Sequence, residues 1–395
     1  MTETGMFDKV VNRGAFWSLL TTRVVYAINW YNIASIFSLI AVEFGQGVSG
    51  LGALTSSFYL GAGLLQIPGG IVAARFGPRL TAIFGTLVMS ISVLISATAN
   101  SFDVIVLARF FVGAGMAFVF APGVVLITQY FRRGAEGLAV GLYNSAYQSG
   151  GVVGLFGWAV VATAIGWRLS LIASGILGLL TVAMILVFVP REDITSRLRV
   201  GAPELRRVLL DRPLLLLGVV ATGISMCSIL ISSFLVYYLI KTFGVVPAVA
   251  GAVGALVFLV PIFSSPLGGR VYDRRKDFRS VVVLAGSVSA VATVVAGFGG
   301  IYGPIVSSLL GGFVSGIGFT IIMSVAREST KMGPEYRLLS VAWVNSISLT
   351  GSFLPPIFFS FLAGTFGYTA AWVGGGALAL LLVLPIVVFR GALSK

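Results

Sequence analysis

The feature that most constrains this chain is a series of long apolar segments that recurs along the whole sequence. A helix that crosses a hydrocarbon core of about 30 Å needs roughly 20 residues at 1.5 Å per residue. Twelve segments meet that length, and we predict membrane helices over 15–43, 52–73, 78–98, 102–127, 137–163, 167–189, 213–241, 247–268, 280–299, 302–325, 338–364 and 367–390. The predicted fold class is therefore an all-α polytopic membrane protein.

The composition agrees with a lipid environment and excludes several functions. Hydrophobic residues make up 57% of the chain and charged residues only 10%, which is outside the range of soluble globular domains. The sequence has no histidine and a single cysteine, Cys227, so the commonest zinc ligand and the commonest general base are missing. We therefore expect no metal, no cofactor and no catalytic residues, and we expect that the chain is not an enzyme.

The basic residues predict the orientation. The longest polar gap divides the helices six and six. If the N-terminus is cytoplasmic, this gap is cytoplasmic too, and most of the 26 Lys and Arg residues lie in segments on that side of the membrane. Basic loops favour the cytoplasm, where the inner leaflet is anionic, so the net charge of +13 requires no nucleic acid. We predict a multi-pass plasma-membrane protein with a cytoplasmic N-terminus (1–14), a six-helix bundle (15–189), a cytoplasmic central loop (190–212), a second six-helix bundle (213–390) and a cytoplasmic C-terminus (391–395).

The two halves share a sequence pattern. Gly70 and Gly269 stand in equivalent loops, 199 positions apart. Further along each half, Asn144, Gly150 and Gly166 match Asn345, Gly351 and Gly367, each at an offset of 201. Repeated positions at nearly one offset predict duplicated six-helix halves, with a substrate cavity between them near the membrane midplane.

The loops between helices 2 and 3 and between helices 8 and 9 resemble a known family signature. The second copy reads Gly269-x-x-x-Asp273-Arg274, which is similar to the loop motif of the major facilitator superfamily of secondary transporters. The resemblance implies twelve helices in two pseudo-symmetric bundles that work by alternating access. It also implies a cytoplasmic gate at Gly70, Arg75, Arg79, Gly269, Asp273 and Arg274, although Ala74 replaces the aspartate of the first copy.

Two further helices bear on the family resemblance. Arg109, followed by Gly113 and Gly115, is similar to the family's pattern in helix 4. The helix 5 pattern of exchangers is matched at Gly141, Gly150 and Gly154, but Leu155 replaces its proline and Trp158-Ala159 replace its closing glycine pair. This departure disfavours a drug/proton antiporter.

Two arginines lie inside predicted helices. Arg23 and Arg109 each stand about 10 Å from their own helix end, whereas no aspartate or glutamate lies deep in a predicted helix. Burying a cation in a bilayer costs at least about 2.5 kcal/mol, so such residues usually face a watery cavity or a partner. An anionic substrate is one partner for both. The alternative is structural, with Arg23 reaching the interface and Arg109 meeting Asp103 or helix-end carbonyls.

Polar and aromatic residues extend this candidate site. Helical spacing places Arg23, Tyr26 and Trp30 on one stripe with Asn29 beside it. The full set of predicted substrate-binding residues is Arg23, Tyr26, Asn29, Trp30, Arg109, Asn144, Tyr147, Gln148 and Asn345, and each can instead serve helix packing. Tyr237 and Tyr238 are weaker candidates, because tyrosines near a membrane surface are commonly interface anchors.

These observations predict a monomeric secondary transporter in the lipid bilayer that moves a small organic anion, such as a carboxylate, by alternating access. Because no group that titrates lies deep in a helix, we expect facilitated transport or anion exchange. The main rival is an efflux transporter for hydrophobic or cationic compounds, in which the arginines are structural. A membrane enzyme or receptor scaffold is disfavoured, because the sequence holds no metal-ligand cluster or nucleophile–base set.

Overall fold

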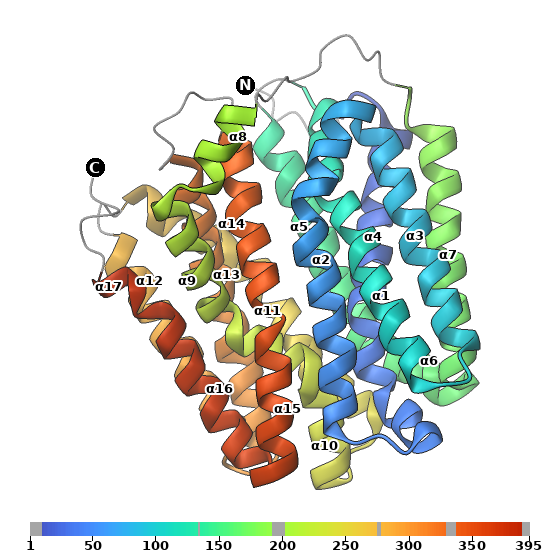
Figure 1. Ribbon diagram of the computed structural model, residues 1–395, viewed down its shortest axis with the longest axis vertical. Helices are drawn as coiled ribbons and strands as arrows, with labels where there is room; N and C mark the ends of the chain where they lie inside the picture. Colours follow the sequence, from blue (N-terminus) through green and yellow to red (C-terminus); the bar gives the residue numbers. More distant parts are fainter. Residues whose placement is uncertain (1–9, 133–134, 192–201, 275–277, 329–336, 389–395) are drawn as a thin grey trace, which may run out of the picture.

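The chain folds into two helical bundles that stand side by side (Figure 1). The computed structural model describes residues 10–132, 135–191, 202–274, 278–328 and 337–388. Its uninterrupted long helices are α1 (Arg13–Phe44), α2 (Val48–Phe76), α3 (Pro78–Thr98), α4 (Phe102–Gln129), α7 (Trp167–Phe188), α11 (Pro247–Arg274), α12 (Phe278–Val295) and α13 (Tyr302–Glu328). In the described ranges eleven helices are long and apolar enough to cross a membrane, and a twelfth, α16 (Tyr368–Val383), is shorter. The all-α polytopic fold class is confirmed.

Three of the spanning segments are interrupted near their middles. A π-turn, η2 (Val153–Gly157), joins α5 (Glu136–Val152) to α6 (Trp158–Ile165), and another, η3 (Ile231–Leu235), joins α9 (Arg212–Leu230) to α10 (Val236–Phe243). The third break separates α14 (Arg337–Gly351) from α15 (Leu354–Phe366). Pro355 and Pro356 follow that break, and because they lack N–H groups they leave the preceding carbonyls without helical donors. Such interruptions in spanning helices often mark functional positions.

The two bundles repeat one packing scheme, as the sequence offsets predict. In the first bundle α1 packs on α5 and α7, and α3 packs on α4 and α7; in the second, α9 packs on α14 and α16, and α12 packs on α13 and α16. Gly166 and Gly367 start equivalent helices with φ of 81° and 88°. Gly45 and Gly244 end equivalent helices with φ of 62° and 64°. Side chains rarely adopt this conformation, so the glycines fix corresponding turns in both halves.

The segment between the bundles contains a helix within the predicted loop 190–212. Helix α8 (Ala202–Leu209) carries exposed Arg206 and Arg207 and buries Val208. Its end of the molecule also holds Arg13, Arg75 and Arg212, and we call this the basic end. The other end, with Glu43, Gly166 and Gly244, is the opposite end; in Figure 1 the basic end is at the top.

The halves meet along two seams, whose contacts lie in and near the middle of the molecule. In the first, between α2 and α14/α15, Ser56 Oγ donates to the carbonyl of Phe353 (2.8 Å) and Ser346 Oγ donates to the carbonyl of Gly63 (3.2 Å). In the second, Gly151 of α5 lies directly against the Phe258 ring of α11. Because Gly63 and Gly151 have no side chain, the helices can approach closely at these positions.

Four glycines of the basic end make no contact with the other half. Side chains built at Gly70, Gly137, Gly141 and Gly269 would meet no neighbouring atom within 4 Å. Gly52 and Gly63, by contrast, lie in close contact with α15 and α14 across the first seam. The described contacts between the halves are therefore tighter toward the opposite end than at these basic-end positions.

Candidate functional site

Aromatic side chains fill the middle of the molecule where the two halves meet. Trp30 of α1 is the hub of this aromatic cluster. Its ring lies 5.7 Å from Tyr26, 5.6 Å from Tyr31, 4.8 Å from Phe58 and 5.8 Å from Tyr147, all in the first half. The cluster then crosses to the second half, because the Tyr31 ring lies 4.3 Å from Phe258 of α11. The hydroxyls of Tyr31 and Tyr147 share a hydrogen bond of 2.5 Å.

Arg109 of α4 is buried beside this cluster, with 2% of its surface exposed. Its Nη1 donates to the carbonyl of Asn29 (2.9 Å) and its Nη2 to the carbonyl of Trp30 (3.0 Å). The guanidinium lies 4.7 Å from the centre of the Phe58 ring, and Nε is buried without a hydrogen-bond partner among the described residues. Carbonyls and a ring are neutral partners, so the positive charge of Arg109 stays uncompensated.

A small cavity adjoins Arg109 between the halves. Its volume is about 10 Å³, about the room of one water molecule. The first half lines it with Arg109 and aromatic side chains, among them Trp30 and Phe58, and the second half lines it with Ser232 and Ser233 of η3. The cavity therefore joins one buried cation of one half to two hydroxyls of the other.

Arg23 occupies a second aromatic environment within the first half. It is 4% exposed, and its Cζ lies 4.4 to 5.0 Å from the ring centres of Tyr26, Phe120, Tyr143 and Tyr147. Its Nε and Nη1 are buried without partners among the described residues. Cation–π contacts stabilise this guanidinium by about 0.5–2 kcal/mol each but do not cancel its charge. Because Tyr26 and Tyr147 contact both Arg23 and Trp30, the two buried cations lie on either side of the aromatic cluster.

The other predicted substrate-binding residues lie in different surroundings. Asn29 is buried, but its side chain faces α7 and donates to the carbonyl of Ser174 (3.3 Å), which is a packing role. Gln148 is half-buried, with an Oε1 that has no described partner, and Asn345 is half-buried. Asn144 is exposed on the basic-end part of α5. The structure thus gathers Arg23, Tyr26, Trp30, Arg109 and Tyr147 around one cluster and leaves the remaining four outside it.

The predicted gate residues do not form one cluster in this structure. Arg79 is buried within the first half, where Nε donates to the carbonyl of Val189 (2.8 Å) and Nη2 to that of Leu186 (3.0 Å) at the end of α7. Arg75 and Arg274 are exposed. Gly70 and Gly269 make no close contact, whereas the preceding glycines do, Gly69 against α4 and Gly268 against α13. The side chain of Asp273 lies outside the described residues, so the cytoplasmic gate stays a prediction.

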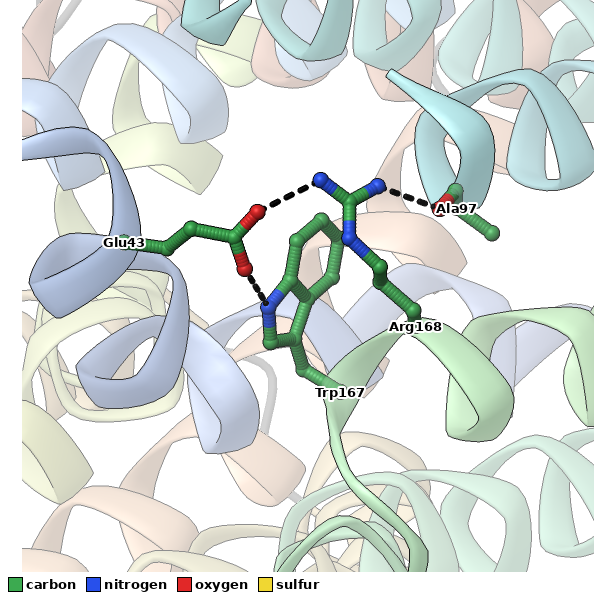
Figure 2. A network of polar contacts seen from close by, with 4 residues as sticks. All are labelled: Glu43, Ala97, Trp167 and Arg168. Carbon is green, nitrogen blue, oxygen red and sulfur yellow. Dashed lines mark hydrogen bonds and ion pairs between the residues drawn. The ribbon is translucent and has the colours of Figure 1, made fainter. Parts of the chain in front are cut away.

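The ion pair between Glu43 and Arg168 lies far from these cations, at the opposite end. Figure 2 shows the carboxylate of Glu43 between its two donors, Trp167 Nε1 at 2.8 Å and Arg168 Nη2 at 2.5 Å. Arg168 Nη1 also donates to the carbonyl of Ala97 (2.8 Å). The network ties α1, α3 and α7 together within the first half, and it leaves Arg168 compensated, unlike Arg109.

Carboxylates are confined to helix ends wherever their side chains are described. They are Glu43, Asp103, Glu136, Asp211 and Glu328. None lines the cavity beside Arg109, and Asp103 is not a hydrogen-bond partner of that arginine. The structural alternative for Arg109 named Asp103 or helix-end carbonyls, whereas its described partners are two carbonyls in the middle of α1.

Sequence reasoning missed the second half's contribution to the cavity. Ser232 and Ser233 sit in an apolar helix, where serines usually serve packing, and the π-turn that brings both to one surface has no clear sequence signal. The tyrosines of the same segment lie elsewhere: Tyr237 packs on Phe37 (5.0 Å), and Tyr238 packs on Trp372 (5.7 Å).

The family model of the Major Facilitator Superfamily matches residues 19–331 and 217–393 of this sequence. The chain belongs to the major facilitator superfamily. It is therefore a membrane transporter and not an enzyme, as predicted, and its two bundles are the halves of that fold.

Solved structures of this superfamily share the fold. An inward-facing, occupied crystal structure of a bacterial homologue of the human lysosomal transporter Spinster superposes with a TM-score of 0.73, at 18% identity, over 96% of this chain and 95% of that one. A D-xylose–proton symporter superposes with a TM-score of 0.75, at 14% identity, over 94% of this chain and 96% of the other. At these identities the likeness shows the fold alone.

Curated relatives differ in what their names say they carry. A nitrite extrusion protein of Bacillus subtilis is 26% identical over 65% of this chain and 65% of its own length. A probable sulfoacetate transporter of Cupriavidus necator is 28% identical over 46% of this chain and 42% of its own length. An agnestins efflux protein of Paecilomyces divaricatus is 24% identical over 73% of this chain and 67% of its own length. The chain thus matches less than two thirds of the length of the first two.

Proposed function

We propose that this superfamily transporter carries a small organic anion, such as a carboxylate, between its two halves by alternating access. The observation that carries the proposal is Arg109, a buried cation that lines the cavity between the halves and has only neutral described partners. A carboxylate would supply the missing negative charge, and its two oxygens suit the planar donors of a guanidinium. The nitrite and sulfoacetate relatives support an anion by analogy.

Arg23 is the second cation of this proposal. It lies across the aromatic cluster from Arg109, and it too has unpaired buried nitrogens among the described residues. Two uncompensated cations in one bundle create a positive potential that attracts an anion from a distance. Arg109 would contact the solute, and Arg23 would raise the local concentration of anions.

The basic end faces the cytoplasm in this proposal, because Lys and Arg gather in cytoplasmic loops. The tighter contacts toward the opposite end then correspond to a transporter closed on its outer side. The orientation is tested by single cysteines in a Cys227→Ser background. Ser101→Cys, exposed at the opposite end, should react with an impermeant thiol reagent on intact cells, and Arg132→Cys, exposed at the basic end, should react only after permeabilisation. The reverse pattern would overturn the orientation.

Counterflow in proteoliposomes tests the transport proposal. Vesicles preloaded with candidate carboxylates, sulfonates, amines or neutral analogues are offered a trace of the same labelled solute. Anions should accumulate, and Arg109→Gln should weaken the apparent affinity about 10- to 150-fold, because a charged hydrogen bond is worth about 1.5–3 kcal/mol. Arg132→Gln, which removes an exposed cation after α4, should behave as wild type.

The same experiment decides the rival function. The aromatic lining of the cavity and the efflux relative favour transport of a hydrophobic or cationic compound. Accumulation of amines with unchanged affinity in Arg109→Gln would establish the rival and refute the anion proposal.

A further inference from the structure

The π-turn of the second half presents two consecutive serines to the cavity. In η3, Ser232 and Ser233 both line the cavity that Arg109 adjoins. Ser232 is 3% exposed and Ser233 4%, so neither hydroxyl serves the surface.

The hydrogen atoms of both hydroxyls are already engaged. Ser232 Oγ and Ser233 Oγ donate to one carbonyl, that of Ile229, at 3.2 and 2.6 Å. A third hydroxyl that lines the cavity, on Thr55, donates to the carbonyl of Leu51 at 2.9 Å. A hydroxyl that donates in this way keeps its lone pairs free, so these oxygens face a solute as hydrogen-bond acceptors. They match a solute that carries a donor of its own.

The first half supplies the complementary requirement. Arg109 brings one positive charge and an unpaired Nε, and no carboxylate among the described residues lines the cavity. Arg109 is the one cation that lines the cavity among the described residues, and it matches one negative charge on the solute. The cavity measures about 10 Å³, so the halves must part to admit any solute larger than water, and a compact solute requires the least separation.

We propose that the cavity selects a compact hydroxylated monoanion, whose charged group meets Arg109 while its hydroxyl donates to the Ser232–Ser233 pair. This inference rests on the proposed anion transport and names the chemical class of its substrate. The serines act as specificity-determining residues, and only a solute with both groups binds the two halves at once. Such bridging is what draws the halves together during alternating access.

The test compares acids that differ only in the hydroxyl. Purified full-length protein is titrated with lactate or propionate, and with isethionate or ethanesulfonate, and the unfolding midpoint gives each apparent affinity. The hydroxylated member of each pair should bind wild type about tenfold more tightly or better, because a site built around a hydroxyl leaves its polar groups unpaired without it. In Ser232→Ala/Ser233→Ala this preference should fall to within about twofold, while the deoxy acid binds as before.

Ser228→Ala is the matched control. Ser228 lies one turn earlier on α9, its Oγ has no described partner, and it does not line the cavity, so the hydroxyl preference should persist. If the double variant does not unfold cooperatively, the same hydroxyl preference is measured in the two single variants, Ser232→Ala and Ser233→Ala.

Three results overturn the serine assignment: equal binding of both acids by wild type, a preference that survives in the double variant, or no stabilisation by any of these acids. Propionate binding that needs Arg109 but ignores the hydroxyl would leave anion transport standing. The counterflow experiment decides that function separately.

Discussion

The two halves share an architecture but differ in what they bury. The first half buries Arg23, Arg79 and Arg109 and most of the aromatic cluster. In the described part of the second half, the buried polar side chains are all serine or threonine. Duplicated backbones have thus acquired different chemistry: the first half holds the charge, and the second half contributes hydroxyls and a contact surface. In the proposed function, substrate charge is therefore recognised by one bundle alone.

The largest effect is expected when a carboxylate is placed in the second half, which removes the difference in charge between the halves at the cavity. Ser232→Asp should put a negative charge across the cavity from Arg109 and pair with it. With its cation compensated, the site should lose anion binding by about 100-fold or more, since buried opposite charges interact strongly. Counterflow of the transported anion measures the loss. Ser232→Asn introduces a neutral side chain of nearly the same size as Asp, so it also removes the serine hydroxyl and adds bulk, but its loss of anion binding should be clearly smaller than that of Ser232→Asp. Normal transport by Ser232→Asp would contradict the asymmetry.

The next largest effect is expected at the first seam, where α2 of the first half packs on α14 of the second. Gly63 lies against Thr350 of α14, and its carbonyl accepts from Ser346 Oγ. Gly63→Val should force α2 and α14 apart, reduce transport about tenfold, and expose the opposite end to thiol reagents, because packed interfaces tolerate little added volume. The matched control is Gly137→Val, on α5, where a side chain meets open space. Equal reactivity of opposite-end cysteines in both variants would show that this seam does not hold the halves together.

A smaller effect is expected at the second cation. Arg23→Gln removes a charge that lies behind the aromatic cluster and does not line the cavity. Anion affinity should fall about three- to tenfold, as for the loss of a partly screened charge worth roughly 1 kcal/mol. Arg23→Lys should restore most of it. Proteoliposome uptake over a range of substrate concentrations gives the apparent affinity of each Arg23 variant. A loss in Arg23→Gln as large as that in Arg109→Gln would place Arg23 at the solute itself.

The smallest expected effect is that of an imposed pH gradient. The carboxylates with described side chains lie at helix ends and the sequence has no histidine, so the described residues in the middle of the molecule include neither of these groups. Uptake of the anion of a strong acid such as isethionate should change by less than about twofold with or without the gradient. A sustained acceleration by inward-directed protons would show that the chain couples transport to protons.

Much of the fold was predictable because lipid imposes a simple rule on the sequence. The twelve apolar segments and the glycine offsets give the helices and the repeat, and the boundaries of α3 agree at both ends with the predicted 78–98. Helix α2 begins four residues before its prediction, since the Gly- and Ser-rich start of Val48–Phe76 reads as a loop. The π-turns escaped prediction, because they depend on packing between helices.

The charged residues of the candidate site could be predicted from the sequence, because burying a charge in a membrane costs free energy. Arg23 and Arg109 stand out because a cation in an apolar helix needs an explanation, and helical spacing correctly joined Arg23 to Tyr26 and Trp30. The same spacing placed Asn29 beside them, but its side chain turns to Ser174 on α7. Ser232 and Ser233 were missed, since serines are common packing residues and their position depends on where the second bundle docks.

Binding of matched acids and amides tests the central claim most directly. Calorimetric titration of the purified protein would compare lactate with lactamide and propionate with propionamide, in wild type, Arg109→Gln and Arg132→Gln. We predict that wild type and Arg132→Gln bind at least one acid at least tenfold more tightly than its neutral amide, and that in Arg109→Gln this preference falls to no more than the contribution of Arg23. Binding of an amide as tight as that of its acid in wild type, or an undiminished acid preference in Arg109→Gln, would contradict the proposed role of Arg109.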